Sequence, residues 1–232
     1  MFLPVTHYSA GLLADLGVPG SKMQILTPAI AMPAESSSSA IISELGLEGC
    51  EIYLVVNRMV KEKGLYDILY AWKMYLKRSK KTNAVLVLIG DGPERKNLMR
   101  LAKEMGLYNT VRFVRQLPNQ QVRSLYKFVK SLILASVSTF TWQEQFGFVL
   151  AEAISAGTPV ISTYSGAIPE VVGKAGLLVP PAHPVALAEA LAKLDDLIIY
   201  NNLKTACQSE MEKFSAQTYI KKICDMYRLL VN

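Results

Sequence analysis

The chain has 232 residues, of which 51% are hydrophobic and 19% charged, and its formal net charge is +6. This composition excludes an intrinsically disordered chain, and the length suffices for one large or two small domains with a substantial core. No apolar run reaches the ~18 residues of a membrane-spanning helix, and the first residues lack the basic region and apolar core of a signal peptide, so we expect a cytoplasmic protein.

The first 45 residues are predicted to form a short segment followed by a linker. Apolar spacing predicts a helix over residues 5–16, and residues 23–26 are typical of a strand. Residues 34–40 include four consecutive serines and have little packing potential, which indicates a linker. We therefore predict a domain boundary there, which separates residues 1–45 from a larger domain of residues 46–232.

From residue 46 onward, predicted strands and helices alternate. Strands are predicted at residues 52–56, 84–89, 111–114, 131–135, 159–162 and 176–179. Helices are predicted at residues 64–77, 94–105, 119–128 (with Asn119 as N-cap), 147–156, 184–196, 200–212 and 215–230. Apolar strands that alternate with helices predict an α/β fold of the Rossmann-like type, a doubly wound parallel sheet with helices on both faces. Such sheets bind ligands beyond the carboxyl ends of their strands.

Two carboxylates lie at one strand–helix junction, in the sequence Glu144-Gln-Phe-Gly-Phe-Val-Leu-Ala-Glu152. The predicted helix 147–156 is almost wholly apolar, so we expect it to be buried. Backbone amides near Phe146 and Gly147 would form an anion site suited to phosphate, and Gly147 would let a ligand approach closely. From the pattern alone, a surface Glu144 and a Glu152 held in a structural hydrogen bond are an equally good interpretation.

This stretch resembles the E-x7-E signature of the family 4 (group 1) retaining glycosyltransferases. Four further blocks match in family order: Asn57-Arg58-Met-Val-Lys-Glu-Lys63-Gly64, Gly90-Asp-Gly-Pro93, Val111-Arg-Phe113 and Gly166-Ala-Ile-Pro-Glu170. The resemblance covers roughly residue 51 to the C-terminus. It implies the C-terminal, donor-binding half of the GT-B fold, with residues 1–45 as the tail of the N-terminal domain and the interdomain linker.

The resemblance also implies a role for each matched residue. Arg58 and Lys63 would contact the diphosphate of the donor, whereas two cations in a loop would otherwise be taken as surface residues. Glu144 would lie against the hydroxyls of the donor sugar, so that Glu144, Arg58 and Lys63 form the catalytic set. The donor-binding set is Arg58, Lys63, Gly90, Leu117, Phe146, Gly147 and Glu152, with Glu152 on the ribose and Leu117 in the loop at the nucleobase edge.

The predicted function, by this resemblance, is transfer of a sugar from a nucleotide-diphosphate sugar to an acceptor hydroxyl with retention, as in glycan biosynthesis. The alternatives are a nucleotide-sugar-binding module without turnover, one chain of a split transferase and, more weakly, a nucleotide-sugar epimerase, which shares the architecture but lacks the block around Glu144. No cofactor and no metal are expected, because no Asp-x-Asp occurs and His7 and His183 are far apart.

The expected partners are a nucleotide-diphosphate sugar, a saccharide or lipid-linked acceptor, and a missing N-terminal domain or a second copy of the chain. The basic balance suits such anionic ligands and also a peripheral contact at the inner face of a membrane. Nucleic-acid binding is disfavoured, because basic and aromatic residues do not interleave as they do in the known modules. The three scattered cysteines favour free thiols in a reducing compartment.

Overall fold

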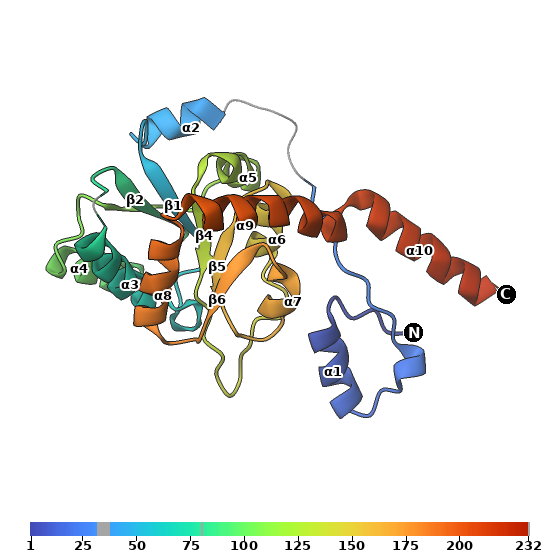
Figure 1. The fold of residues 1–232 in the computed structure, drawn as a ribbon. Coiled ribbons are helices and arrows are strands. Elements are labelled where there is room, and N and C mark those ends of the chain that lie inside the picture. The colour runs from blue at the N-terminus through green and yellow to red at the C-terminus, as the bar shows by residue number, and fades with distance from the viewer. Residues whose placement is uncertain (32–37, 80, 232) are drawn as a thin grey trace.

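Six parallel strands form the central sheet, in the order β3-β2-β1-β4-β5-β6 (Figure 1). The computed structural model describes residues 1–31, 38–79 and 81–231. The strands are β1 (Glu51–Val56), β2 (Ala84–Ile89), β3 (Val111–Val114), β4 (Ser131–Leu134), β5 (Val160–Thr163) and β6 (Gly176–Val179). This arrangement confirms the predicted Rossmann-like parallel sheet.

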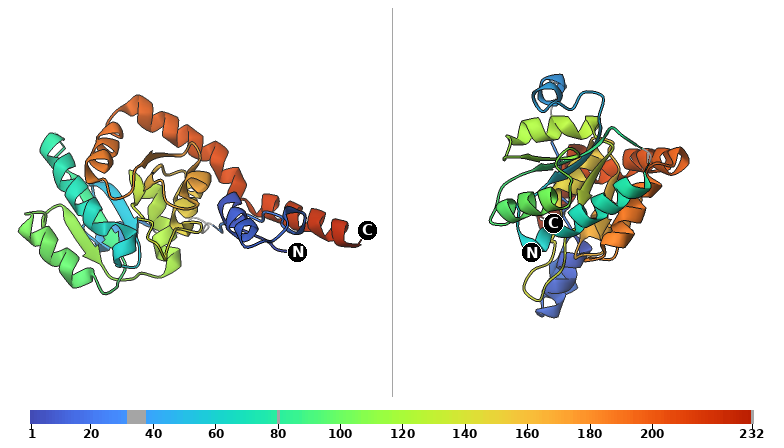
Figure 2. Two further views of the ribbon diagram at one scale, coloured as in Figure 1. Left: turned by 90° about the horizontal axis from the view of Figure 1, so that it is seen from below. Right: turned by 90° about the vertical axis from the view of Figure 1, so that its left-hand side faces the viewer.

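Helices cover both faces of the sheet (Figures 1 and 2). The helices of the chain are α1 (His7–Asp15), α2 (Ser38–Glu44), α3 (Leu65–Arg78), α4 (Arg95–Glu104), α5 (Asn119–Leu125), α6 (Phe148–Ser155), α7 (Ile168–Val172), α8 (Pro184–Lys193), α9 (Leu197–Glu210) and α10 (Ala216–Val231), of which α1 and α10 do not cover the sheet. Tyr53 and Val55 of β1 pack in a core with α3, α4 and α8, while Ile52 and Leu54 pack with α2, α5, α6 and α7. This alternation follows from the two-residue period of a strand that is buried on both faces.

Several local predictions are wrong, for identifiable reasons. Residues 23–26 form no sheet strand: Met23 makes one isolated bridge to Phe2, and Pro4 in the opposite segment has no amide proton to extend a ladder. Asn119 is the first residue of α5 rather than its N-cap, because Pro118 occupies the cap position. Helix α6 is not buried on every face, since Phe148 is 54% exposed.

The segment before the sheet contains a helix that the sequence did not predict. Most of the predicted linker at residues 34–40 lies outside the described residues, but α2 begins at Ser38 and packs against α5. Ile41 and Leu47 join the core of the sheet domain. The domain boundary after residue 45 stays a prediction.

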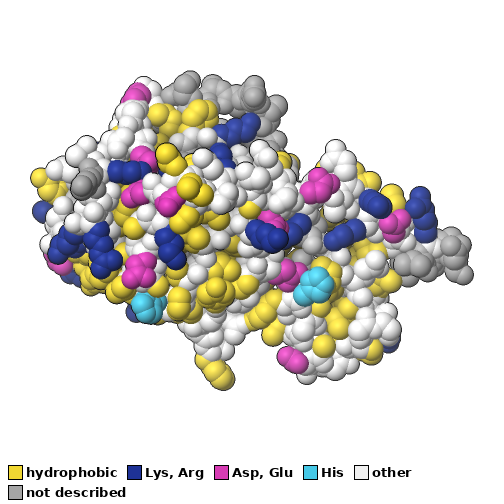
Figure 3. Space-filling view, viewed as in Figure 1, with side chains coloured by type: hydrophobic (Ala, Val, Ile, Leu, Met, Phe, Trp, Pro, Cys, Tyr) yellow, Lys and Arg dark blue, Asp and Glu magenta, His cyan; other side chains and the backbone are white. Residues whose placement is uncertain are grey.

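Both termini lie at the same end of the molecule, where α1 and α10 extend away from the sheet (Figures 1 and 2). Helix α1 has no buried residue, and hydrophobic side chains are exposed on this part of the surface (Figure 3). On α10, Ile220 and Tyr227 are exposed, while Met226 is buried. In the described part of the chain, none of the helices combines the length and the apolar content needed to cross a bilayer.

Candidate functional site: the cavity beyond the strand ends

A cavity of about 470 Å³ opens at the carboxyl edge of the sheet, beyond the ends of β1 and β2. Its walls include five of the predicted site residues: Arg58, Lys63, Gly90, Leu117 and Glu152. Three others, Glu144, Phe146 and Gly147, do not line it. The structure therefore brings most of the predicted donor site together around one cavity.

Lys63 lines this cavity and forms an ion pair with Glu144 beside it. Lys63 ends a 3₁₀ turn before α3, and its Nζ donates a hydrogen bond of 2.6 Å to Oε2 of Glu144. Ser136, just after β4, donates a second bond of 3.0 Å to the same oxygen. The two charged side chains are only 18% and 12% exposed. The ammonium also lies 4.6 Å from the ring centroid of Trp142, a cation–π contact that fixes its position further.

Glu144 lies on a loop whose backbone is held by the predicted block at Gly166. The amide of Ala167 donates to the carbonyl of Glu144 at 2.9 Å. Gly166 has a φ of +54°, and the two backbones approach so closely that a Cβ atom at Gly166 would lie 2.1 Å from that carbonyl oxygen. The block around Gly166 thus positions Glu144 through the main chain.

Glu152 projects from the second turn of α6 and is held by two side chains from the α5 region. Arg123 donates to Oε1 through Nε at 2.9 Å, and its Nη2 lies 2.9 Å from the same oxygen. The Tyr126 hydroxyl donates to Oε2 at 3.0 Å. Burial raises the pKa of Tyr126 well above its usual value, and the nearby Glu152 raises it further, so this hydroxyl stays a donor. Glu152 therefore has a structural hydrogen-bond role and also faces the cavity.

Phe146 and Gly147 contribute backbone rather than side chain. The Phe146 ring is buried and packs 4.8 Å from that of Phe148 and 6.1 Å from that of Phe214, measured between centroids. Gly147 is the N-cap of α6 in a left-handed conformation, and no side chain caps the helix there. The prediction that amides at this helix start bind phosphate stays a prediction.

Four residues that contact or adjoin the predicted set were not identified from the sequence as site residues. Arg123, Tyr126 and Ser136 orient the two carboxylates, and no local motif marks them. Asn57 lines the cavity, and its Nδ2 is buried with no hydrogen-bond partner among the described residues. A buried amide with unused donors indicates a position where a ligand oxygen could bind.

The described residues contain no group of three or more His, Cys, Asp or Glu side chains that could hold a metal ion. His7 contacts Glu170, while His183 caps α8 by accepting from the amide of Ala186 at 3.1 Å. The expectation that ligand binding needs no metal stays a prediction.

The chain is similar to known glycosyltransferases in sequence and in fold. The family described as glycosyl transferases group 1 matches residues 38–205. A D-inositol 3-phosphate glycosyltransferase of Corynebacterium jeikeium is 31% identical over 223 residues, which cover 91% of this chain and 51% of that protein. An N-acetyl-alpha-D-glucosaminyl L-malate synthase of Bacillus anthracis is 29% identical, over 79% of this chain and 47% of that protein.

Solved structures share the fold at lower identity. A glycosyltransferase from Rickettsia africae superimposes with a TM-score of 0.85 at 17% identity, over 99% of this chain and 63% of that one. HepE of Anabaena, solved in complex with UDP, gives 0.83 at 19% identity, over 97% of this chain and 63% of that one. The chain spans about half the length of the curated relatives it matches. The matched family and the arrangement of the sheet together show that this chain belongs to the group 1 glycosyl transferases.

Proposed function

We propose that this chain binds a nucleotide-diphosphate sugar in the cavity at the carboxyl edge of the sheet, and that it forms the donor-binding portion of a retaining glycosyltransferase. The observation that carries the proposal is the contact between Lys63 and Glu144 beside the cavity. It places a cation suited to a diphosphate next to a carboxylate suited to sugar hydroxyls.

Lys63 and Arg58 have N–H donors that can bind the leaving diphosphate. A lysine ammonium has three N–H donors, and Glu144 takes one from Lys63. Arg58, which lines the cavity and is exposed, adds a planar fork that matches phosphate oxygens. Sugar transfer builds negative charge on the diphosphate as the glycosidic bond breaks, and fixed cations at that position lower the barrier.

The two carboxylates have separate roles in this proposal. Among the described residues, Oε2 of Glu144 takes both of its hydrogen bonds, so Oε1 remains to accept a hydroxyl of the donor sugar. Glu152 accepts from Arg123 and Tyr126, and Oε2 keeps one lone pair for a ribose hydroxyl. Because Tyr126 and Arg123 fix the rotamer, Glu152 is oriented before the ligand arrives.

Known relatives support a nucleotide donor. HepE of Anabaena was solved with UDP, with UDP and glucose, and with UDP-glucose. A uridine nucleotide is therefore the first ligand to test on this chain, with a guanosine nucleotide beside it.

Transfer to an acceptor needs more than this cavity. Positioning of two substrates supplies much of the rate of a bimolecular reaction. Because the chain spans about half the length of its curated relatives, we propose that transfer requires a complementary N-terminal portion or self-association through the termini. Because the donor cavity is lined wholly by residues of this chain, a second candidate function is a nucleotide-sugar-binding module without turnover.

The test is calorimetric titration of UDP and GDP into the chain and into Lys63→Ala. The variant should bind the nucleotide more weakly by about 1.5–3 kcal/mol, the range for a hydrogen bond to a charged group. Lys61→Ala is the matched control, since Lys61 lies in the same turn but does not line the cavity. Uridine without phosphates should bind both variants alike. Equal losses for UDP and uridine would disprove the diphosphate assignment.

A transfer assay with saccharide and lipid-linked acceptors separates the two candidate functions. The chain should be inactive alone and active when mixed with the N-terminal half of a related enzyme. Nucleotide-sugar binding with no transfer in any such mixture favours the binding module.

A further inference from the structure

A second cavity, of about 370 Å³, lies at the amino edge of the sheet, opposite the donor cavity. Glu51 begins β1 here, Lys130 directly precedes β4, and Tyr200 and Lys204 lie four residues apart on α9. Cys50 and Lys127 also line this cavity. Nothing in the proposed donor chemistry uses these side chains.

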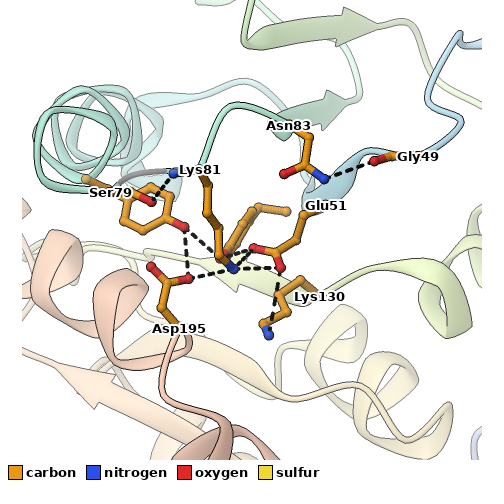
Figure 4. Close-up of polar contacts among 9 residues, drawn as sticks. Gly49, Glu51, Ser79, Lys81, Asn83, Lys130 and Asp195 are labelled. Carbon is orange, nitrogen blue, oxygen red and sulfur yellow. Dashed lines mark hydrogen bonds and ion pairs between the residues drawn. The ribbon is translucent and has the colours of Figure 1, made fainter.

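Glu51 and Lys130 of the cavity wall belong to a polar network that also includes Lys81 and Asp195 (Figure 4). Lys81 lies between two carboxylates, with its Nζ 2.7 Å from Oε2 of Glu51 and 2.8 Å from Oδ1 of Asp195. Burial alone would lower the pKa of Lys81, but its bonds to Asp195 and Glu51 raise it. Both carboxylates therefore bind Lys81.

Lys130 is the unusual group in the cavity wall. Its side chain is only 10% exposed, and its Nζ lies 3.9 Å from the nearest carboxylate oxygen, on Glu51. The ammonium is 3.6 Å from the ring centroid of Tyr200, which stabilises its charge but accepts no conventional hydrogen bond. It donates no side-chain hydrogen bond within the part of the chain that the structure describes. The side chain is thus nine-tenths buried, while its ammonium faces the cavity with three donors available to an acceptor there.

The charges around the cavity favour an anionic acceptor. Lys127 and Lys204 are both exposed and line the same wall as Lys130. Together with Lys81 they make four cations against the carboxylates of Glu51 and Asp195, so two positive charges remain unbalanced. Burial lowers the pKa of Lys130, and a bound anion would reverse that shift.

We propose that this cavity is a second, phosphate-class anion site, with Lys130 as its central donor and Lys127 and Lys204 at its flanks. A free phosphate or pyrophosphate and the headgroup of an anionic lipid present the same chemistry to these lysines. Phe128, which lines the mouth, is 51% exposed, so an apolar contact is available beside a headgroup. The site is separate from the donor cavity and does not depend on the proposed function.

Cys50 gives the site a native reporter. Its thiol is free, half-buried and part of the cavity wall. The rate at which iodoacetamide alkylates Cys50 is measured by peptide mass spectrometry, against increasing pyrophosphate or phosphate at constant ionic strength. A bound anion should slow the reaction, because it covers the thiol and disfavours the thiolate. Exposed Cys224 should react at an unchanged rate.

Variants assign the effect to the lysines. In Lys130→Met, the anion concentration that half-protects Cys50 should rise about tenfold or more. This ratio corresponds to losing a hydrogen bond to a charged group. The pair Lys127→Ser and Lys204→Ser should weaken it without disturbing the core, since both side chains are exposed. Lys96→Ser, an exposed lysine on α4, is the matched control and should change nothing. Buried Cys207 monitors folding, because it becomes reactive in any variant that unfolds.

Vesicles of phosphatidylcholine with and without phosphatidylglycerol distinguish a site for a free anion from a site for an anionic lipid headgroup. Protection by phosphate or pyrophosphate that Lys130→Met removes identifies a free-anion site. Protection by phosphatidylglycerol vesicles alone, again lost in Lys130→Met, identifies a headgroup site. Absence of protection by every anion, or equal protection in folded Lys130→Met, overturns the proposal.

Discussion

Replacing Gly166 by alanine tests whether the loop after β5 fixes the position of Glu144. Gly166 has a φ of +54°, where an L-residue is strained by about 1–2 kcal/mol. The new Cβ would lie 2.1 Å from the carbonyl oxygen of Glu144, so one backbone must move by about 1 Å. That movement breaks the 2.9 Å bond from the amide of Ala167 to Glu144, worth about 1 kcal/mol, and adds about 1–3 kcal/mol of overpacking.

We therefore expect Gly166→Ala to lower the free energy of unfolding by about 3–6 kcal/mol in urea titration. Gly106→Ala is the matched control, because Gly106 has a similar φ of +74° but no atom within 4 Å of the position that a Cβ would take. It should lose only the conformational part, about 1–2 kcal/mol. Equal losses in the two variants would refute the idea that Gly166 supports Glu144 through close backbone contact.

Three further predictions concern the support of the site and its metal independence. Arg123→Met leaves Glu152 without its ion partner, so nucleotide affinity in calorimetry should fall roughly tenfold, and unchanged affinity would contradict the role of Arg123. Burial favours the protonated form of Glu170, but hydrogen bonds from His7 and Tyr8 outweigh burial and lower the pKa of this carboxyl. The resulting stabilisation of the folded state is present above the usual pKa of 4.5 and is lost as the pH falls through the lowered pKa. Glu170→Gln should thus speed amide exchange of α1 relative to wild type at pH 7, with a difference that shrinks at acid pH. Nucleotide titrations with and without a chelator should agree, and an absolute need for magnesium or manganese would count against the proposed site.

The sheet was predictable because its strands are short apolar runs between Gly- and Pro-containing turns. The predicted bounds of β2, β3 and β6 match the structure, and β1 differs by one residue. The strand predicted at residues 23–26 was wrong because periodicity reports only an extended apolar segment, while a continuous ladder also needs amides on the partner, and Pro4 has none. Helix α2 was missed because its serine-rich start has the composition of a linker, and only tertiary contact with α5 reveals why it is helical.

The candidate site was predictable only in its matched motifs. Lys63 and Glu144 are 81 residues apart, and they meet because β1 and β4 are neighbours in the sheet. That order cannot be read from the hydrophobic pattern of either strand. Arg123 and Tyr126 belong to the helical segment before β4, and nothing in their local sequence marks them as partners of a carboxylate on α6.

The spacing of Glu144 and Glu152 does not put them on one helix face. Helix α6 begins at Phe148, so Glu144 belongs to a loop and Glu152 to the second turn. The loop carboxylate is held by Lys63 and Ser136, the helical one by residues of the α5 region, and the two sets share no residue. Because their supports are independent, each carboxylate can contact a different part of one ligand, and loss of either support should leave the other in place. A seven-residue gap across a loop–helix junction thus allows two carboxylates to be held independently, so that they can face different parts of one ligand.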